Sequence, residues 1–168
     1  MKQFNFHEAK NVKGAVKAAS KKSAFLSGGQ TLIPSMKLRL SSFDDVINVK
    51  NIKDLQGIKV SSKSVTIGAA TTHAEVAASK DVKKAIPSLS HLAGMIGDAQ
   101  VRNKGTLGGS IANNDPSACY PSACIALDAT IHTSDRKIEA SKFFKGMFET
   151  ALKKDELVTA VEFKIPES

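Results

Sequence analysis

The chain has 168 residues, of which 42% are hydrophobic, enough for one large domain or two small lobes with a real core. Its net charge of +8 comes from lysines spread along most of the chain without interleaved aromatic residues, which favours a solvated surface over nucleic-acid binding. The two cysteines and four isolated histidines show no metal-ligand spacing, and no apolar run has the length of a signal peptide or membrane span. We therefore expect a cytoplasmic protein that binds neither a metal ion nor nucleic acid.

A glycine stretch near the N-terminus is the first candidate site. We expect a surface helix over residues 7–20, a buried strand over 23–26, and then Ser27–Thr31 (SGGQT), here named the first glycine stretch. A helix can begin within residues 31–40, where Pro34 suits a first turn. Glycines allow close approach of the backbone, and free N–H groups at a helix start favour a phosphate. A lone Gly-Gly pair, however, more often marks an ordinary turn.

The middle of the chain carries hairpin and helix signals. Residues 46–49 are β-branched and predict a strand, and residues 58–68 predict a hairpin. Thr72 and Glu75 have the spacing of a capping box at a helix start. Residues 85–99 are mostly small and apolar, which predicts a buried helix.

A second glycine stretch, Thr106–Ser110 (TLGGS), has the same ingredients as the first. Two such stretches favour one dinucleotide whose phosphates meet bare peptide nitrogens from both. Neither stretch fits the GxGxxG fingerprint or the P-loop. A polar turn at 113–116, a helix at 122–127, a hairpin over 130–139 and a long strand over 155–165 complete an α+β fold of two lobes.

Two long motifs then resemble a known family. Ser27–Leu40 (SGGQTLIPSMKLRL) and Arg102–Ala112 (RNKGTLGGSIA), followed by Asn114–Pro116, are similar to the FAD-carrying medium subunit of the xanthine dehydrogenase and carbon monoxide dehydrogenase family of molybdenum hydroxylases. The resemblance implies a two-lobed FAD-binding domain of the vanillyl-alcohol-oxidase (PCMH) type. We expect the lobes to be residues 1–55 and 56–168, with FAD between them.

The resemblance also implies which residues contact FAD. Asn113 and Cys119 are expected beside the ribityl chain, and the backbone near Leu157 at the isoalloxazine. Ile96 falls near the adenine end. The pyrophosphate is expected to meet both glycine stretches, namely Ser27, Gly28, Gly29, Gln30, Thr31, Leu32, Thr106, Leu107, Gly108, Gly109 and Ser110.

The sequence departs from the family at three places. Cys119 stands where many members carry an Asp, and a thiol is a weaker hydrogen-bond partner for a ribityl hydroxyl. Ser110 stands where Asn or Asp is common. Family members usually continue for roughly a hundred further residues, about one small domain, so we expect the usual C-terminal domain to be missing from this chain.

By this resemblance the chain is a flavoprotein subunit of an oxidoreductase. Electrons from a molybdopterin-binding large subunit pass through a 2Fe-2S small subunit to FAD, and then to NAD, a quinone or another acceptor. No nucleophile–base pair stands out, so we assign no catalytic side chain, since the cofactor performs the redox step. The alternative is a flavin-free assembly module that keeps the fold and only docks the other subunits.

Overall fold

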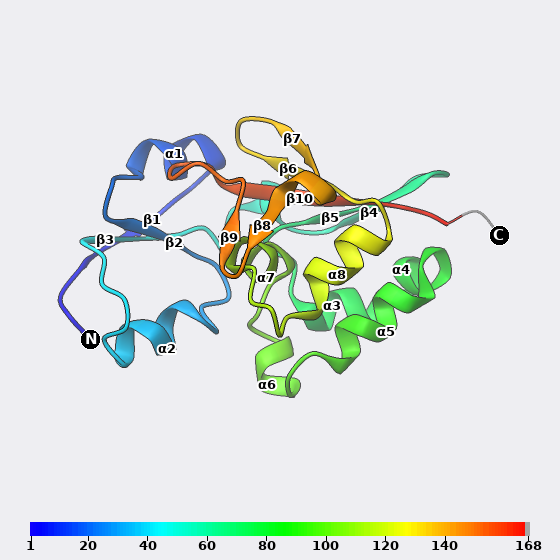
Figure 1. Ribbon diagram of the computed structural model, residues 1–168, viewed down its shortest axis with the longest axis horizontal. Helices are drawn as coiled ribbons and strands as arrows, with labels where there is room; N and C mark the ends of the chain where they lie inside the picture. The colour runs from blue at the N-terminus through cyan, green and yellow to red at the C-terminus, as the bar shows by residue number, and fades with distance from the viewer. Residues whose placement is uncertain (167–168) are drawn as a thin grey trace.

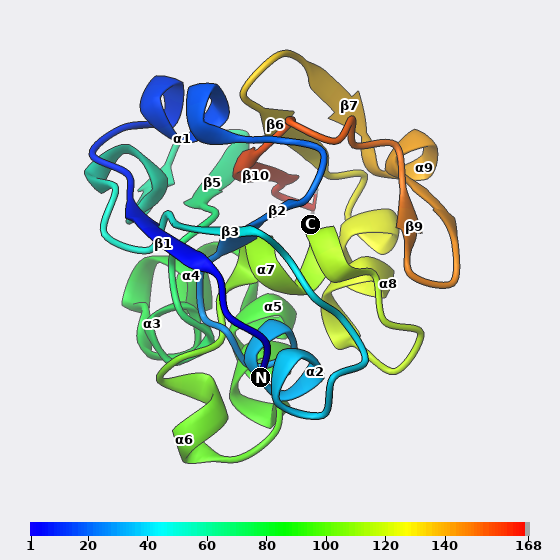
Figure 2. The same ribbon diagram turned by 90° about the vertical axis from the view of Figure 1, so that its left-hand side faces the viewer.

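The computed structural model describes residues 1–166 and shows two sheets with helices packed around them (Figure 1). The first sheet is parallel, in the order β1 (Asn5–Glu8), β3 (Asp45–Asn48), β2 (Ser23–Leu26). Helices α1 (Val12–Ala18) and α2 (Leu32–Lys37) cover its two opposite faces, as Figures 1 and 2 both show. Because β2 is an edge strand, its end and the start of α2 lie at the edge of the first sheet.

The second sheet is antiparallel and has the order β4-β5-β10-β6-β7. The predicted hairpins over 58–68 and 130–139 are confirmed by the pairing of β4 with β5 and of β6 with β7. The predicted C-terminal strand is β10, in the middle of the sheet, and it starts three residues later than expected. The strands are β4 (Ile58–Val60), β5 (Ser64–Gly68), β6 (Thr130–Thr133), β7 (Lys137–Glu139) and β10 (Val158–Lys164).

Short helices connect the strands and cover one face of the second sheet (Figure 1). The capping box at Thr72 and Glu75 is confirmed, because each residue accepts a hydrogen bond from the backbone N–H of the other. Pro87 begins a helix, where a missing N–H costs nothing. The remaining elements are η1 (Lys53–Leu55), α3 (His73–Ala78), α4 (Lys80–Ala85), α5 (Pro87–Met95), α6 (Ala99–Arg102), α7 (Leu107–Asn113), α8 (Cys119–Ala126), α9 (Ala140–Phe143), β8 (Phe144–Gly146) and β9 (Glu149–Thr150).

Two apolar cores hold the elements together. The larger one lies between the second sheet and its helices and includes the fully buried Tyr120, Phe143 and Phe163. The smaller one joins α1 and the first sheet to two residues from the far side of the predicted boundary, Ala70 and Leu157. The sheets separate between Asn48 and Ile58, but this smaller core crosses from one to the other.

Several predicted helix boundaries were wrong. The helix expected over 7–20 begins only at Val12, because Asn5–Glu8 pairs with β3 as a strand and the Asn11 side chain caps the helix by accepting from Gly14 N at 2.7 Å. The helix expected over 85–99 ends at Met95, since Gly97 adopts φ +51°. The helix predicted to begin within residues 31–40 is confirmed: α2 begins at Leu32 and ends at Lys37, shortly before Arg39 at φ +62°.

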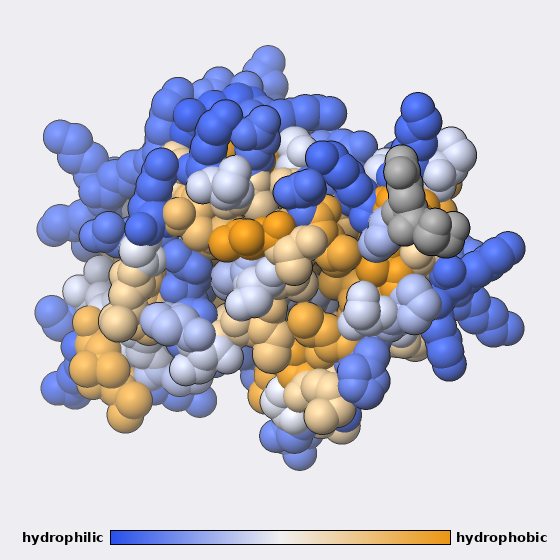
Figure 3. All heavy atoms as spheres, turned by 45° about the vertical axis from the view of Figure 1, so that its right-hand side comes forward, coloured by the Kyte–Doolittle hydropathy of each residue, from blue (hydrophilic) through white to orange (hydrophobic). Residues whose placement is uncertain are grey.

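The surface is mixed in character. On the face drawn in Figure 3, hydrophilic residues cover the top, the upper left and the right, while apolar residues gather across the middle and at the lower left. Within residues 1–166, no helix combines the length and the apolar character that crossing a membrane requires.

Candidate functional site

The first glycine stretch connects β2 to α2 and leaves a run of backbone donors unused. Gly29 has φ +72°, a left-handed conformation that suits glycine, and so the chain turns sharply there. Among the hydrogen bonds within residues 1–166, none uses the backbone N–H groups of residues 28–32. The Gln30 side chain turns back and donates to Gly28 O at 3.1 Å. The stretch therefore offers consecutive bare amides to a ligand.

The second glycine stretch differs from its prediction, because it forms the first turn of α7 and the backbone N–H groups of residues 107–110 are hydrogen-bonded within the protein. Leu107 N donates to Thr71 O at 3.1 Å, and Gly108 N donates to Ala69 O at 2.9 Å. Thr106 caps the helix, accepting from Gly109 N at 3.2 Å on its side-chain oxygen. The expectation of bare nitrogens in both stretches is thus wrong for the second one, since the turn that follows β5 supplies acceptors.

The two stretches nevertheless meet in space. Ser27 Oγ lies 3.0 Å from Thr106 Oγ1, a hydrogen bond that joins residues 79 positions apart. A Cβ at position 28 would collide with Lys104 O and lie 2.7 Å from Gly105 Cα. Only glycine permits this approach of two backbones. The bare amides of the first stretch therefore lie beside the first turn of α7.

Gly109 is the open position of the second stretch. It is exposed, and a Cβ there would meet only the Thr106 hydroxyl, 3.0 Å away. Gly108, one residue earlier, is buried, and its Cβ would lie 2.8 Å from Ala69 O. The stretch thus seats one glycine against the sheet and leaves the other open to a ligand.

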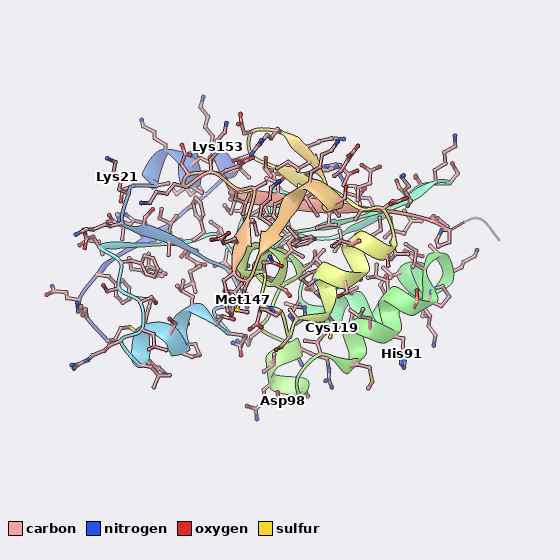
Figure 4. The ribbon with its side chains drawn as sticks, viewed as in Figure 1. Lys21, His91, Asp98, Cys119, Met147 and Lys153 are labelled. Atoms are coloured by element: carbon pink, nitrogen blue, oxygen red, sulfur yellow. The ribbon has the colours of Figure 1, made fainter. Side chains whose placement is uncertain are left out.

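The remaining predicted residues lie at varied depths. Ile96 is half-buried, and Arg102 fixes its turn by donating to Ile96 O at 3.1 Å and to Gly97 O at 3.3 Å. Asn113 is half-buried at the end of α7, and Cys119 is exposed at the start of α8 (Figure 4).

Leu32 borders an apolar groove of the first sheet. Its side chain lines an apolar groove of about 130 Å³ between α2 and the first sheet, together with Phe6, Leu26 and Met36. We therefore expect any contact of Leu32 with a phosphate to come from its backbone N–H.

Both backbone groups of Leu157 are hydrogen-bonded to Ser134, in the turn between β6 and β7. Its N–H donates to Ser134 Oγ at 3.1 Å, and its C=O accepts from Ser134 N at 2.8 Å. Its side chain is buried in the smaller core beside α1. A flavin contact at this point needs the second lone pair of the carbonyl oxygen.

Asn114 is a structural residue of the site that the sequence analysis did not single out. It has φ +45° and ends α7 in a left-handed conformation, which Asn tolerates. Its side chain donates to Gly146 O and Glu149 O, both at 2.8 Å, and so holds the β8–β9 hairpin against α7. Met147, at the tip of that hairpin, is exposed (Figure 4). The dense turn chemistry around Asn114 was the available signal.

A buried polar pair lies beneath the second stretch. His73 and Tyr120 are 5% and 0% exposed, with ring centroids 5.4 Å apart, and His73 packs against Gly105. Burial lowers the pKa of His73 to about 4, so the ring is neutral at neutral pH. Burial also raises the pKa of Tyr120, helped by Cys124 and Cys119. Two buried, uncharged side chains therefore lie beneath the second glycine stretch.

Comparison with known proteins identifies the family. Residues 2–167 match the family described as the FAD binding domain in molybdopterin dehydrogenase. The chain belongs to this family. The family resemblance stated from the two motifs is therefore confirmed, and FAD is the family's cofactor.

Relatives and solved structures agree with this assignment. The chain is 38% identical to the glyceraldehyde dehydrogenase medium chain of Sulfolobus acidocaldarius and 34% identical to the carbon monoxide dehydrogenase medium chain of Hydrogenophaga pseudoflava. These matches cover 97% and 98% of this chain and 60% and 59% of the relatives. The chain thus spans about three fifths of the length of the curated relatives it matches.

The fold matches solved members of the family equally well. A structure of carbon monoxide dehydrogenase from Hydrogenophaga pseudoflava lacking the Mo-pyranopterin moiety superimposes with a TM-score of 0.95 at 32% identity. It covers 99% of this chain and 61% of that one. Quinoline 2-oxidoreductase from Pseudomonas putida 86 gives a TM-score of 0.94 at 29% identity, covering 99% and 61%.

Proposed function

We propose that this chain binds FAD in the seam between residues 1–55 and residues 56–168, in the manner of the vanillyl-alcohol-oxidase (PCMH) type. The observation that supports the proposal most is the run of unused amides at 28–32 beside the first turn of α7. Consecutive peptide N–H groups suit a diphosphate, which carries negative charge and several acceptor oxygens.

The chain's own residues bind and orient the cofactor in this proposal. The amides of residues 28–32 donate to the pyrophosphate, and the linked hydroxyls of Ser27 and Thr106 add donors at the seam. Gly109 leaves room for the ligand beside α7. Asn113 and Cys119 line the ribityl chain, and Ile96 lies near the adenine. When bound, FAD supplies the redox chemistry.

We further propose that the flavin receives electrons from a 2Fe-2S small subunit, fed by a molybdopterin-binding large subunit, and passes them to an acceptor. The names of the relatives support this role, because they are medium chains of dehydrogenases. Such a subunit transfers electrons and needs no acid–base residue of its own.

A titration of the purified chain with FAD tests the proposal. We expect stoichiometric uptake, read from the flavin absorption bands. Gly109→Val should weaken binding at least about 100-fold, since the branched side chain fills the open position where the ligand approaches. Gly94→Ala is the matched control, because a Cβ there makes only an ordinary contact, 3.8 Å from Ala77 Cβ.

Two outcomes of this titration count against FAD binding. Gly109→Val, shown by circular dichroism to be folded, contradicts the proposed site if it binds FAD as tightly as the unmodified chain. A folded chain that takes up no flavin supports the alternative, a flavin-free assembly module.

A further inference from the structure

Glu156 places a buried carboxylate at the end of the loop that leads into β10. Its side chain is 1% exposed. Arg136 donates from Nε to Oε1 at 3.0 Å and from Nη2 to Oε2 at 3.1 Å. Thr133 Oγ1 lies 2.6 Å from Oε1, and Lys153 N donates to Oε2 at 2.9 Å. We name Thr133, Arg136 and Glu156 the latch.

The charge of Glu156 is secured by these contacts. Burial alone raises the pKa of this carboxyl, but hydrogen bonds from Arg136, Lys153 and Thr133 outweigh burial and bring it to about 2. A buried carboxylate with both oxygens occupied is costly to disturb, because removing one partner leaves the other without compensation.

The latch holds the loop over 151–157 against the turn between β6 and β7. Arg136 Nη2 also donates to Ala151 O at 2.7 Å, which fixes the start of the loop. Ser134 fixes its end through both backbone groups of Leu157. Lys153, which Figure 4 shows on the upper rim of the molecule, adds an exposed ion pair with Asp135 at 2.7 Å.

Leu157 carries this constraint into the other lobe. Its side chain packs in the smaller core with Ala15 of α1 and Ile47 of β3. The chain then enters β10, whose irregular start lets Thr159 O accept from Ala69 N at 2.9 Å. Ala69 O in turn accepts from Gly108 N. One continuous set of contacts thus connects the latch to the first lobe and to the second glycine stretch.

We propose that the latch is a positioning element of the flavin site, which sets Leu157 between the lobes and so fixes how the two glycine stretches meet. This inference rests on the proposed function, because it concerns the geometry offered to FAD. Glu156 is accordingly a positioning residue: it acts through Leu157 and Ala69.

The test compares two paired glutamates of the same strand region. Glu156→Gln removes the latch charge. Glu162→Gln removes the charge of a carboxylate that lies 3.0 Å from His132 Nε2 and belongs to β10 itself, away from the loop. The readouts are the thermal midpoint, the FAD dissociation constant, and the amide NMR shifts of residues 28–32 in flavin-free protein.

We expect Glu156→Gln to raise the FAD dissociation constant about tenfold or more and to move the amide signals of residues 28–32. Glu162→Gln should change FAD affinity less than about twofold, because its carboxylate is a third exposed. If Glu156→Gln does not fold, Thr133→Val takes its place in the test, because it removes one hydrogen bond to the same carboxylate. It also removes the acceptor of two backbone N–H groups in the β6–β7 turn.

Unchanged amide signals at 28–32 in the folded latch variant overturn the inference, and so do equal changes in both glutamate variants. The NMR readout needs no flavin. A chain that fails to bind FAD therefore refutes the proposed function alone, while the amide signals still decide whether the latch positions the first stretch.

Discussion

The two glycine stretches look alike in sequence but do different work. Around Gly28 the backbone presses against Lys104 and Gly105, and the amides of 28–32 remain without protein acceptors among the described residues. Around Gly108 the backbone is seated on Ala69, with its amides consumed by the fold. The difference teaches that a Gly-Gly pair can keep its backbone amides free or have them hydrogen-bonded within the fold, and that the surrounding acceptors decide which.

The largest effect is expected from placing a side chain in the contact between the two stretches. Gly28→Ala places a Cβ against the Lys104 carbonyl and the Gly105 backbone, neither of which can rotate away. We expect a stability loss of about 3 kcal/mol by urea denaturation, and FAD binding at least about 100-fold weaker. Gly109→Ala is the matched change in the other stretch and should leave stability nearly unchanged. Equal stability losses in both variants would remove the distinction between the stretches.

The second effect is a pH dependence of stability that comes from His73, which is buried beneath the second stretch. His73 has a pKa of about 4 in the folded chain and about 6.5 unfolded, so the unfolded chain binds more protons between these values. Stability should therefore fall by roughly 3 kcal/mol as pH drops from about 6.5 to about 4. His73→Gln should flatten this window in urea titrations.

Glu156 also makes stability fall as pH falls, over a lower pH range than His73. Its depressed pKa means that stability is present above about 4.5 and is lost as pH falls toward about 2. His73→Gln should leave this lower window in place. If the stability of His73→Gln still falls steeply between pH 6.5 and 4, the pH dependence in that range does not come from His73.

The smallest effect tests whether the region after the second stretch contacts FAD through its side chains. Cys119→Asp introduces the carboxylate common at this position in the family, at an exposed helix start that favours negative charge. We expect FAD binding to tighten about tenfold, since a hydrogen bond to a charged group is stronger than one to a thiol. Cys119→Ser is the control and should gain less. An equal gain with Ser would argue against a charged acceptor.

Local signals in the sequence were sufficient for the local structure. The capping box at Thr72 depends on residues within one turn, and both long hairpins alternate clearly enough to be recognised. The strand at Asn5–Glu8 escaped prediction because its side chains are exposed throughout and show no apolar alternation. This strand forms because it pairs with β3, a contact that its own sequence pattern does not indicate.

Long-range contacts were beyond the sequence patterns. The proximity of the two glycine stretches was predicted from their shared composition and agreed with the family resemblance. The hydrogen bond from Gly108 N, by contrast, depends on Ala69, a residue 39 positions away. No periodicity reports such a contact. The same holds for Glu156, whose partner Arg136 comes from the turn between β6 and β7.

Hydrogen exchange of individual backbone amides, with and without saturating FAD, tests the central claim most directly. We expect the amides of residues 28–32 to become protected on addition of FAD, while those of residues 107–109, already bonded within the protein, change little. Exchange at 28–32 that stays equally fast in the FAD-saturated chain would contradict the claim that these amides bind the diphosphate.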